Sequence, residues 1–379
     1  MKISISATNP CHLFAMASEL ARAHALGAYY SGYPQWKLGP AAGVNVRTHS
    51  LRTNIVYGLL KFVPEKLRPP SRSLFLWQDH GFDRWVGAHL EPCDFIHAMP
   101  GQCLETFRAA RRLGVPTVLN HATGPVREWV RIMEPEYARA GLRLEDCCTY
   151  DAPYFAREDE EYALSDLHCA ASTIVRDQLI AQGIAREKIW VVPYGAEERL
   201  FFVDGSPPPT DFRIVFAGQA GLRKGLRTLL DALSLAGQES WRVDFYGAVL
   251  GEARADLAAY RGPTPLEFHG AVSQAQLGDA FRRSSVLVLP SLEEGFGLVV
   301  PQALSCGVPC IVSDCAGAKD LIRHRENGSI FTARDSGALA AELAWWSEHP
   351  LRLTEAYRWI EPAQQLLAVS TAAMGGKTA

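Results

Sequence analysis

Two polar side chains eight residues apart, Glu294 and Gln302, belong to the segment EEGFGLVVPQALSCG, residues 293–307. An ionised carboxylate accepts hydrogen bonds from two neighbouring hydroxyl groups at once, and its charge makes each bond about twice as strong. A glutamine keeps one acceptor oxygen and adds an NH₂ donor, while a hydroxyl group both donates and accepts. Both side chains therefore suit a ligand that is rich in hydroxyl groups.

The turn between these two residues favours a phosphate site. It follows a predicted buried strand, SVLVLPS (285–291), and leads into a helix predicted from about Leu298 to Cys306. Gly295 and Gly297 allow the backbone to approach a ligand closely. The helix start offers unpaired N–H groups and a positive dipole end to a diphosphate. On its own, such a turn is also compatible with a tight connection that binds nothing.

A second candidate phosphate contact is the basic pair Arg223-Lys224 in RIVFAGQAGLRKG, residues 213–225. A predicted strand ends there at Gly218, and a polar loop carries the pair to the start of a helix. Two cations in that place can neutralise phosphate oxygens without a metal ion. A solvated helix entry is the alternative interpretation.

His121 is the third candidate, directly after the predicted strand PTVLN. A histidine at the carboxyl end of a strand can hydrogen-bond a sugar hydroxyl or a developing charge. A partly buried structural histidine is equally compatible with this spacing.

The elements that must position these residues alternate between short β-branched runs and helical stretches, which is typical of parallel sheets. Several runs are apolar throughout, as strands buried on both faces should be. The predicted strands are 2–7, 94–99, 116–122, 167–172 and 189–195, then 212–218, 241–247, 266–270, 285–291, 309–314 and 328–331. GVNVRTHS (43–50) is a further possible strand, and the remainder of 41–90 is left open.

The α/β pattern breaks near 196–211, where EERLFFVDGSPPPTDF carries three consecutive prolines, and restarts afterwards. This predicts two doubly wound Rossmann-like domains that face each other across a cleft. Ligands of such sheets bind at the carboxyl ends of the strands. We expect an N-terminal acceptor-binding domain over 1–200, a C-terminal donor-binding domain over 201–354, and a last segment, 355–379, that returns to the first domain.

The amino-acid composition argues against several classes of protein. The 379 residues are 48% hydrophobic and 21% charged, with a net charge of -3, which argues against a nucleic-acid partner. No apolar run approaches the roughly 18 residues that span a bilayer, and we expect no signal peptide. The nine cysteines form no Cys-x-x-Cys pair, which predicts reduced thiols in a cytoplasmic protein and no zinc site.

Taken together, these motifs resemble the family-4 retaining glycosyltransferases, which have the GT-B fold. The resemblance covers most of the second half and extends back to about residue 160, whereas the first 90 residues match loosely. The segments that carry it are 160–201, FAGQAGLRKGLRTLLDAL (216–233), 268–314, ENGSIF (326–331) and AYRWIEPAQQLL (356–367). The last of these is similar to the helix that crosses back onto the first domain.

The resemblance implies a role for each motif. Glu294 would address the transferred sugar, Lys224 the diphosphate and His121 the reacting end of the donor sugar; these three are the catalytic candidates. Gln302 falls where the family usually has a glutamate that binds the ribose hydroxyls. The other implied donor contacts are Gly218, Gln219, Arg223, Gly295, Phe296, Gly297 and Leu298.

Two positions depart from the family pattern. Gln219 stands where arginine is frequent, and Arg223 is an alternative source of that charge. The substitution at Gln302 removes one charged hydrogen bond, which we expect to cost on the order of 1–2 kcal/mol, or roughly tenfold in nucleotide affinity. The reacting carbon is untouched, so Gln302 is compatible with an active enzyme.

The implied reaction is retaining transfer of a hexose-type sugar from a UDP- or GDP-linked donor to a hydroxyl of a glycan or lipid-linked acceptor. We expect no metal and no further cofactor, and a role in cell-surface polysaccharide or glycoconjugate synthesis. Two alternatives stay open: a non-catalytic protein of the same fold that binds nucleotides or glycans, and a sugar-nucleotide 2-epimerase.

Candidate acceptor contacts lie in the first domain. Tyr30, Tyr33 and Trp36 in YYSGYPQWKLGP (29–40) suit stacking on a sugar, although a packed loop explains them as well. Arg127 and Arg131 are four residues apart and would share a helix face after His121. They suit an acceptor phosphate or a plain solvated face.

The segment NIVYGLLKFVPEKLRPPSR (54–72) joins an apolar run to four basic residues, Lys61, Lys66, Arg68 and Arg72, with only Glu65 opposing. Such a stretch suits an anionic membrane surface. The negative net charge and the helix-breaking Pro64 argue against contact. Peripheral contact with the inner membrane face therefore stays an open expectation, as does the oligomeric state.

Overall fold

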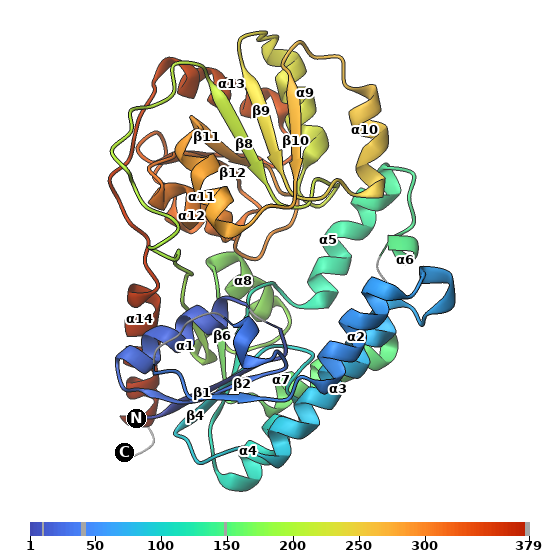
Figure 1. Cartoon of the computed structure of the whole chain (residues 1–379), viewed down its shortest axis with the longest axis vertical. Helices are drawn as coiled ribbons and strands as arrows, with labels where there is room; N and C mark the ends of the chain where they lie inside the picture. Colours follow the sequence, from blue (N-terminus) through green and yellow to red (C-terminus); the bar gives the residue numbers. More distant parts are fainter. Residues whose placement is uncertain (10, 39–42, 148–149, 376–379) are drawn as a thin grey trace.

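The computed structural model describes residues 1–9, 11–38, 43–147 and 150–375. It contains two parallel α/β sheets, one above the other in Figure 1. The first sheet has seven strands in the order β3-β2-β1-β4-β5-β6-β7, and the second has six in the order β10-β9-β8-β11-β12-β13. This confirms the predicted architecture of two doubly wound domains.

The strands agree closely with the apolar runs of the sequence because most are buried on both faces. The first sheet contains β1 (Ile3–Ala7), β2 (Leu26–Ser31), β3 (Val46–Thr48), β4 (Phe95–Ala98), β5 (Thr117–His121), β6 (Leu167–Ala170) and β7 (Ile189–Val191). The second contains β8 (Arg213–Ala217), β9 (Arg242–Tyr246), β10 (Leu266–Gly270), β11 (Val286–Leu289), β12 (Cys310–Ser313) and β13 (Gly328–Phe331).

Helices cover the faces of both sheets. Those of the first half are α1 (His12–Arg22), α2 (Leu51–Phe62), α3 (Ser71–Ala88), α4 (Leu104–Leu113), α5 (Val126–Arg139), α6 (Leu144–Cys147), α7 (Ala152–Leu164) and α8 (Thr173–Ala181). Those of the second are α9 (Leu226–Ala236), α10 (Arg254–Ala259), α11 (Gln274–Arg282), α12 (Val299–Ser305), α13 (Ser336–Glu348) and α14 (Ile360–Gly375). Single 3₁₀ turns lie at 35–37, 65–67, 186–188, 251–253 and 317–321.

The interpretation of YYSGYPQW as an aromatic loop was wrong in part. Its first residues belong to β2, which pairs with β1. Tyr30 is fully buried, and its hydroxyl donates to the His89 carbonyl at 3.3 Å. Tyr30 is therefore unavailable for stacking on a sugar.

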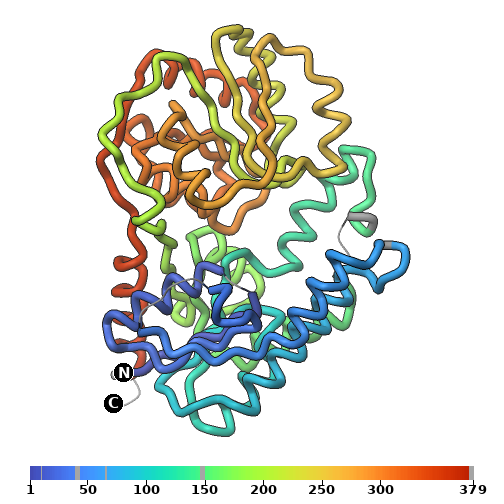
Figure 2. The backbone as a smooth tube through the Cα atoms, in the orientation of Figure 1, coloured from blue at the N-terminus to red at the C-terminus, as the bar shows by residue number. Residues whose placement is uncertain are grey.

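The last helix returns to the first domain. The connection that leaves the first domain after Ala196 and the one that returns to it near Tyr357 run side by side (Figure 2). The Ala196 N–H donates to the Tyr357 carbonyl at 2.6 Å. Beyond them, α14 packs beside α1, and the Gln365 amide donates to the Val191 carbonyl at 2.7 Å. The C-terminal segment thus fastens the second domain to the first.

The domains also touch at the carboxyl ends of their strands. The Ser172 hydroxyl donates to the Gly295 carbonyl at 2.6 Å, and Arg334 pairs with Glu136 at 2.6 Å. These contacts join α5 and the start of α8 to loops of the second sheet.

Candidate donor-binding site

Lys224 and Glu294 come from different strand ends and meet at the centre of the site. Lys224 follows β8, Glu294 follows β11, and the Lys224 Nζ atom contacts a carboxylate oxygen of Glu294. Both side chains are mostly buried, with 12% and 11% exposure. The sequence predicted both residues as parts of one site, and the structure brings them together.

Gly225 allows this approach because its backbone lies against the second loop. Its φ is +68°, and a Cβ atom there would lie 1.9 Å from the Pro290 carbonyl oxygen. Gly218 likewise has a φ of +133° beside the Lys224 side chain. The glycines therefore hold the Lys224 loop against the Glu294 loop.

Arg223 joins the same cluster. Its Nη1 atom lies 3.3 Å from Glu293 Oε2 and 3.5 Å from Glu294 Oε2. Burial raises the pKa of Glu293, while Arg223 lowers it in part. Gln219, the position where the family often has arginine, is exposed. Arg223 thus lies beside Lys224 as a second cation near Glu294.

The glycine turn after Glu294 lies against the first domain. A Cβ atom on Gly295 would be 2.4 Å from the Ala122 carbonyl oxygen, one residue after His121. Gly297 has a φ of +95°, and α12 begins just after Leu298. Phe296 is buried, with its ring 5.0 Å from that of Tyr194, so its side chain packs the interdomain core.

Gln302 lines a cavity of about 870 Å³ between the two domains. Leu298, Gln274 and Trp359 line it from the second half of the chain, and Cys11 and His12 from the first. The Gln302 Nε2 atom donates to Gln274 Oε1 at 3.0 Å. This bond uses one of the two amide N–H groups and leaves the Gln302 oxygen as an acceptor for a hydroxyl group.

His121 is fully buried at the end of β5. Its Nε2 atom lies 3.0 Å from His168 Nδ1, while its Nδ1 atom has no partner among the described residues. Burial, with His168 adding to it, holds the pKa of His121 well below its usual range. The ring is therefore neutral and can exchange a hydrogen bond with a ligand but carries no charge.

The acceptor candidates are dispersed over the first domain. Arg127 pairs with Asp159 at 2.5 Å and Arg131 with Glu128 at 2.8 Å, as expected for a solvated helix face. The Tyr33 ring packs edge-on against Tyr57 at 5.7 Å. Trp36 is 78% exposed. These four residues form no single cluster.

The sequence interpretation missed two partners of the site. Gln274 stands 28 residues before Gln302, and His168 stands 47 residues after His121. Gln274 and Gln302 lie on helices α11 and α12, and His121 and His168 on the paired strands β5 and β6, so each pair forms only in the folded chain. The apolar strand LHCAAS, which contains a lone histidine, was the available signal for His168.

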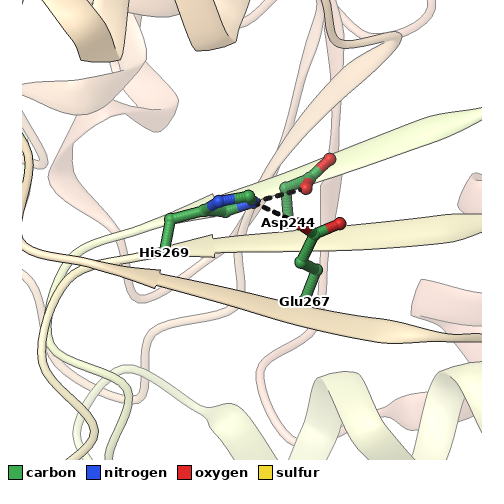
Figure 3. A group of neighbouring side chains, drawn as sticks. All are labelled: Asp244, Glu267 and His269. Carbon is green, nitrogen blue, oxygen red and sulfur yellow. Dashed lines mark hydrogen bonds and ion pairs between the residues drawn. The ribbon is translucent and has the colours of Figure 1, made fainter.

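One group of described side chains has the composition of a metal site: Asp244, Glu267 and His269 (Figure 3). Asp244 and Glu267 are register partners on β9 and β10, and His269 Nε2 lies 2.7 Å from Asp244 Oδ1. The group lies on the edge strand β10 of the second sheet and on its neighbour β9. None of the three belongs to the cluster around Lys224 and Glu294.

Comparison with known proteins finds glycosyltransferases among the relatives of this chain. Residues 198–366 match the family model described as glycosyl transferases group 1. The chain is 28% identical over 302 residues to D-inositol 3-phosphate glycosyltransferase 1 of Catenulispora acidiphila, covering 70% of this chain and 69% of that one.

Two further proteins extend the comparison. The GDP-mannose-dependent alpha-mannosyltransferase of Mycobacterium tuberculosis is 30% identical over 238 residues, covering 59% of this chain and 55% of the relative. The structure of Anabaena HepE in complex with UDP-glucose superposes with a TM-score of 0.63 at 16% identity, covering 98% of this chain and all of that one. Residues 198–366 are thus similar to the group 1 glycosyltransferases, and the two parallel sheets of the whole chain have the GT-B fold.

Proposed function

We propose that this glycosyltransferase moves a hexose-type sugar from a UDP- or GDP-linked donor to a hydroxyl group of a glycan or lipid-linked acceptor, with retention at the anomeric carbon. The observation that carries the proposal is the convergence of Lys224 and Glu294 beside the Gly295 turn. That turn lies against the end of β5, so a donor there would reach both domains. The relatives that act with GDP-mannose or were solved with UDP-glucose support the two donor classes.

The side chains of the candidate site have different roles in the proposed reaction. Lys224 and Arg223 stabilise the departing diphosphate, because fixed cations stabilise the charge that develops on the leaving group. Glu294 orients the transferred sugar, and neutral His121 hydrogen-bonds it near the anomeric carbon. The two cations provide charge stabilisation that needs no metal ion, so the proposed step is metal-independent.

The proposed transfer breaks one bond at the anomeric carbon and forms another. The bond from that carbon to the diphosphate oxygen breaks, and a bond to the acceptor oxygen forms on the same face. The acceptor hydroxyl gives its proton to the departing phosphate oxygen. Glu294, held by Lys224, serves as a sugar ligand and forms no covalent bond.

Gln302→Glu is expected to tighten binding of the preferred nucleoside diphosphate about tenfold. The new carboxylate would accept from two ribose hydroxyls, and the Gln274 amide can turn so that its nitrogen faces the new oxygen. Calorimetric titration of both proteins measures the change. The paired control is the 2′-deoxynucleotide, for which the gain should shrink; equal affinities of both proteins for the ribonucleotide would contradict ribose binding at this position.

A lipid-linked acceptor fits the helical hairpin formed by α2 and α3, which protrudes at one side of Figure 1. Among its exposed apolar residues, Phe62 is 76% exposed and Leu67 77% exposed, and both are near the connection. Lys61 and Lys66 stand next to them in the sequence. We therefore include peripheral contact with an anionic membrane surface, on the cytoplasmic face, in the proposal. Among the described residues, no helix is long and apolar enough to cross a bilayer.

The double substitution Phe62→Ser and Leu67→Ser is expected to weaken binding to phosphatidylglycerol vesicles at least about tenfold, because each side chain loses apolar contact worth about 1.5–3 kcal/mol when fully buried. Cosedimentation measures the bound fraction. Leu235→Ser, at a 66% exposed position in the second domain, is the control. If the doubly substituted protein binds the vesicles as well as the wild type does, the hairpin does not contact the membrane.

A further inference from the structure

Two carboxylates and a histidine gather on one face of the second sheet, at its edge. Glu267 and His269 lie two residues apart on β10, and Asp244 is the register partner of Glu267 on β9. Residues two apart in a strand, and residues directly opposite on neighbouring strands, point to the same face of a sheet. The ring of His269 is directed at both carboxylates (Figure 3). Three side chains of metal-ligand type thus converge from two neighbouring strands.

The charges of this group are not balanced by basic side chains. Like charges directly opposite each other destabilise a pair of strands, and Asp244 and Glu267 have that arrangement. Among the described residues, no lysine or arginine forms an ion pair with either carboxylate, and His269 is the partner of both. The Asp244 side chain is only 12% exposed, so solvent screens its charge poorly. A divalent cation between the two carboxylates would remove their repulsion.

The distances suit an ion with short bonds to its ligands. His269 Nε2 lies 2.7 Å from Asp244 Oδ1 and 3.9 Å from Glu267 Oε1, and all three ligand atoms lie within 4.8 Å of one another. The ligand atoms of a tetrahedral zinc ion, with bonds of about 2.0–2.2 Å, are about 3.4 Å apart. The Glu267 side chain is 71% exposed, so it can turn inward to close the longer gap.

Tyr246 holds the His269 ring in place. The two rings are stacked, with their centroids 4.5 Å apart and their planes inclined by 10°. Tyr246 lies two residues after Asp244 on β9, so one strand provides a ligand and also supports a second ligand. This contact fixes the direction of the ring nitrogen before an ion binds. A ligand that is already oriented loses less conformational freedom on binding.

The types of ligand select the ion. An imidazole nitrogen suits zinc and its neighbours among the first-row metals, whereas Mg²⁺ and Ca²⁺ prefer oxygen ligands throughout. We propose that Asp244, Glu267 and His269 bind one Zn²⁺ ion, with water in the remaining position, and that the ion fastens β10 to β9. Two carboxylates and one neutral imidazole give this complex no net charge. Because none of the three residues belongs to the Lys224–Glu294 cluster, the inference does not depend on the proposed sugar transfer.

Calorimetric titration of untagged, metal-free protein with ZnCl₂ tests the site. We expect the wild type to have a Zn²⁺ site that Glu267→Gln and His269→Gln each weaken at least about tenfold, because even the loss of a group that only supports a ligand has an effect of that size. Glu267→Gln keeps the size of an exposed side chain and should leave the fold intact. The matched control is His324→Gln, at an exposed histidine that lies 4.0 Å from the Glu342 carboxylate. All four proteins contain the same cysteines, so zinc bound by thiols does not affect the comparison.

Thermal unfolding provides a second measurement, because an ion that binds only the folded state raises the unfolding temperature. Zn²⁺ should raise the Tm of the wild type and of His324→Gln more than that of Glu267→Gln or His269→Gln. Equal zinc affinities of the wild type and these two variants would overturn the inference. A wild type that binds no zinc would also overturn it, and the carboxylates would then serve only to keep the edge strand β10 from pairing with another chain.

Discussion

Lys224→Met is expected to slow sugar transfer by roughly 100- to 1000-fold, which is the usual effect of removing one preorganised group that stabilises developing charge. Methionine keeps much of the length of lysine and fills the same partly buried space. Glu294 retains Arg223 as a partner at 3.5 Å, so the loop keeps a compensating charge. The substitution should therefore lower the rate of sugar transfer more than the stability of the fold.

Rates of donor consumption with UDP-glucose and GDP-mannose measure this effect, with thermal unfolding as the check on folding. Arg227→Met is the matched control, because Arg227 is 63% exposed on α9 and pairs with Asp256. A Lys224→Met enzyme that is as active as Arg227→Met would show that Lys224 does not stabilise the leaving group.

Gly295→Ala should lower kcat by about 100-fold, since small displacements of reacting groups have costs of that order. The added Cβ would lie 2.4 Å from the Ala122 carbonyl oxygen and 2.5 Å from the Thr123 Cα atom. Both are backbone atoms of the other domain, so the conflict is relieved only if the domains separate. Nucleotide affinity should change little, because the remaining donor contacts belong mainly to the second domain.

Small-angle scattering with bound nucleotide tests this separation, and we expect a larger radius of gyration for Gly295→Ala than for the wild type. The control is Gly251→Ala, at a glycine whose added Cβ meets no atom within 4 Å. Wild-type dimensions together with wild-type kcat would contradict the close approach of Gly295 to the end of β5.

The fold and the candidate site of the second domain were predictable because both depend on short, local sequence patterns. The run SVLVLPS predicts β11, and the glycines after it predict the turn that brings Glu294 to Lys224. In the first domain the signals were weaker. β2 (LGAYYS) contains a glycine and lies next to turn-forming residues, so its tyrosines were interpreted as a loop.

What the sequence did not reveal depends on contacts between distant segments. The hydrogen bond from Gln302 to Gln274 forms only when α11 packs beside α12, and His168 approaches His121 only when β6 pairs with β5. The sequence does not predict helices α2 and α3, since prolines interrupt the apolar pattern between them.

The central claim is that a nucleoside diphosphate binds between the Lys224 loop and the turn at Gly295. Calorimetric titration of the wild type and Lys224→Met with UDP, GDP and ADP tests it most directly. The account predicts that one nucleotide binds the wild type selectively and that Lys224→Met weakens it about tenfold. If none of the three binds the wild type, or if the substitution leaves affinity unchanged, the assignment of this cleft to the donor is wrong.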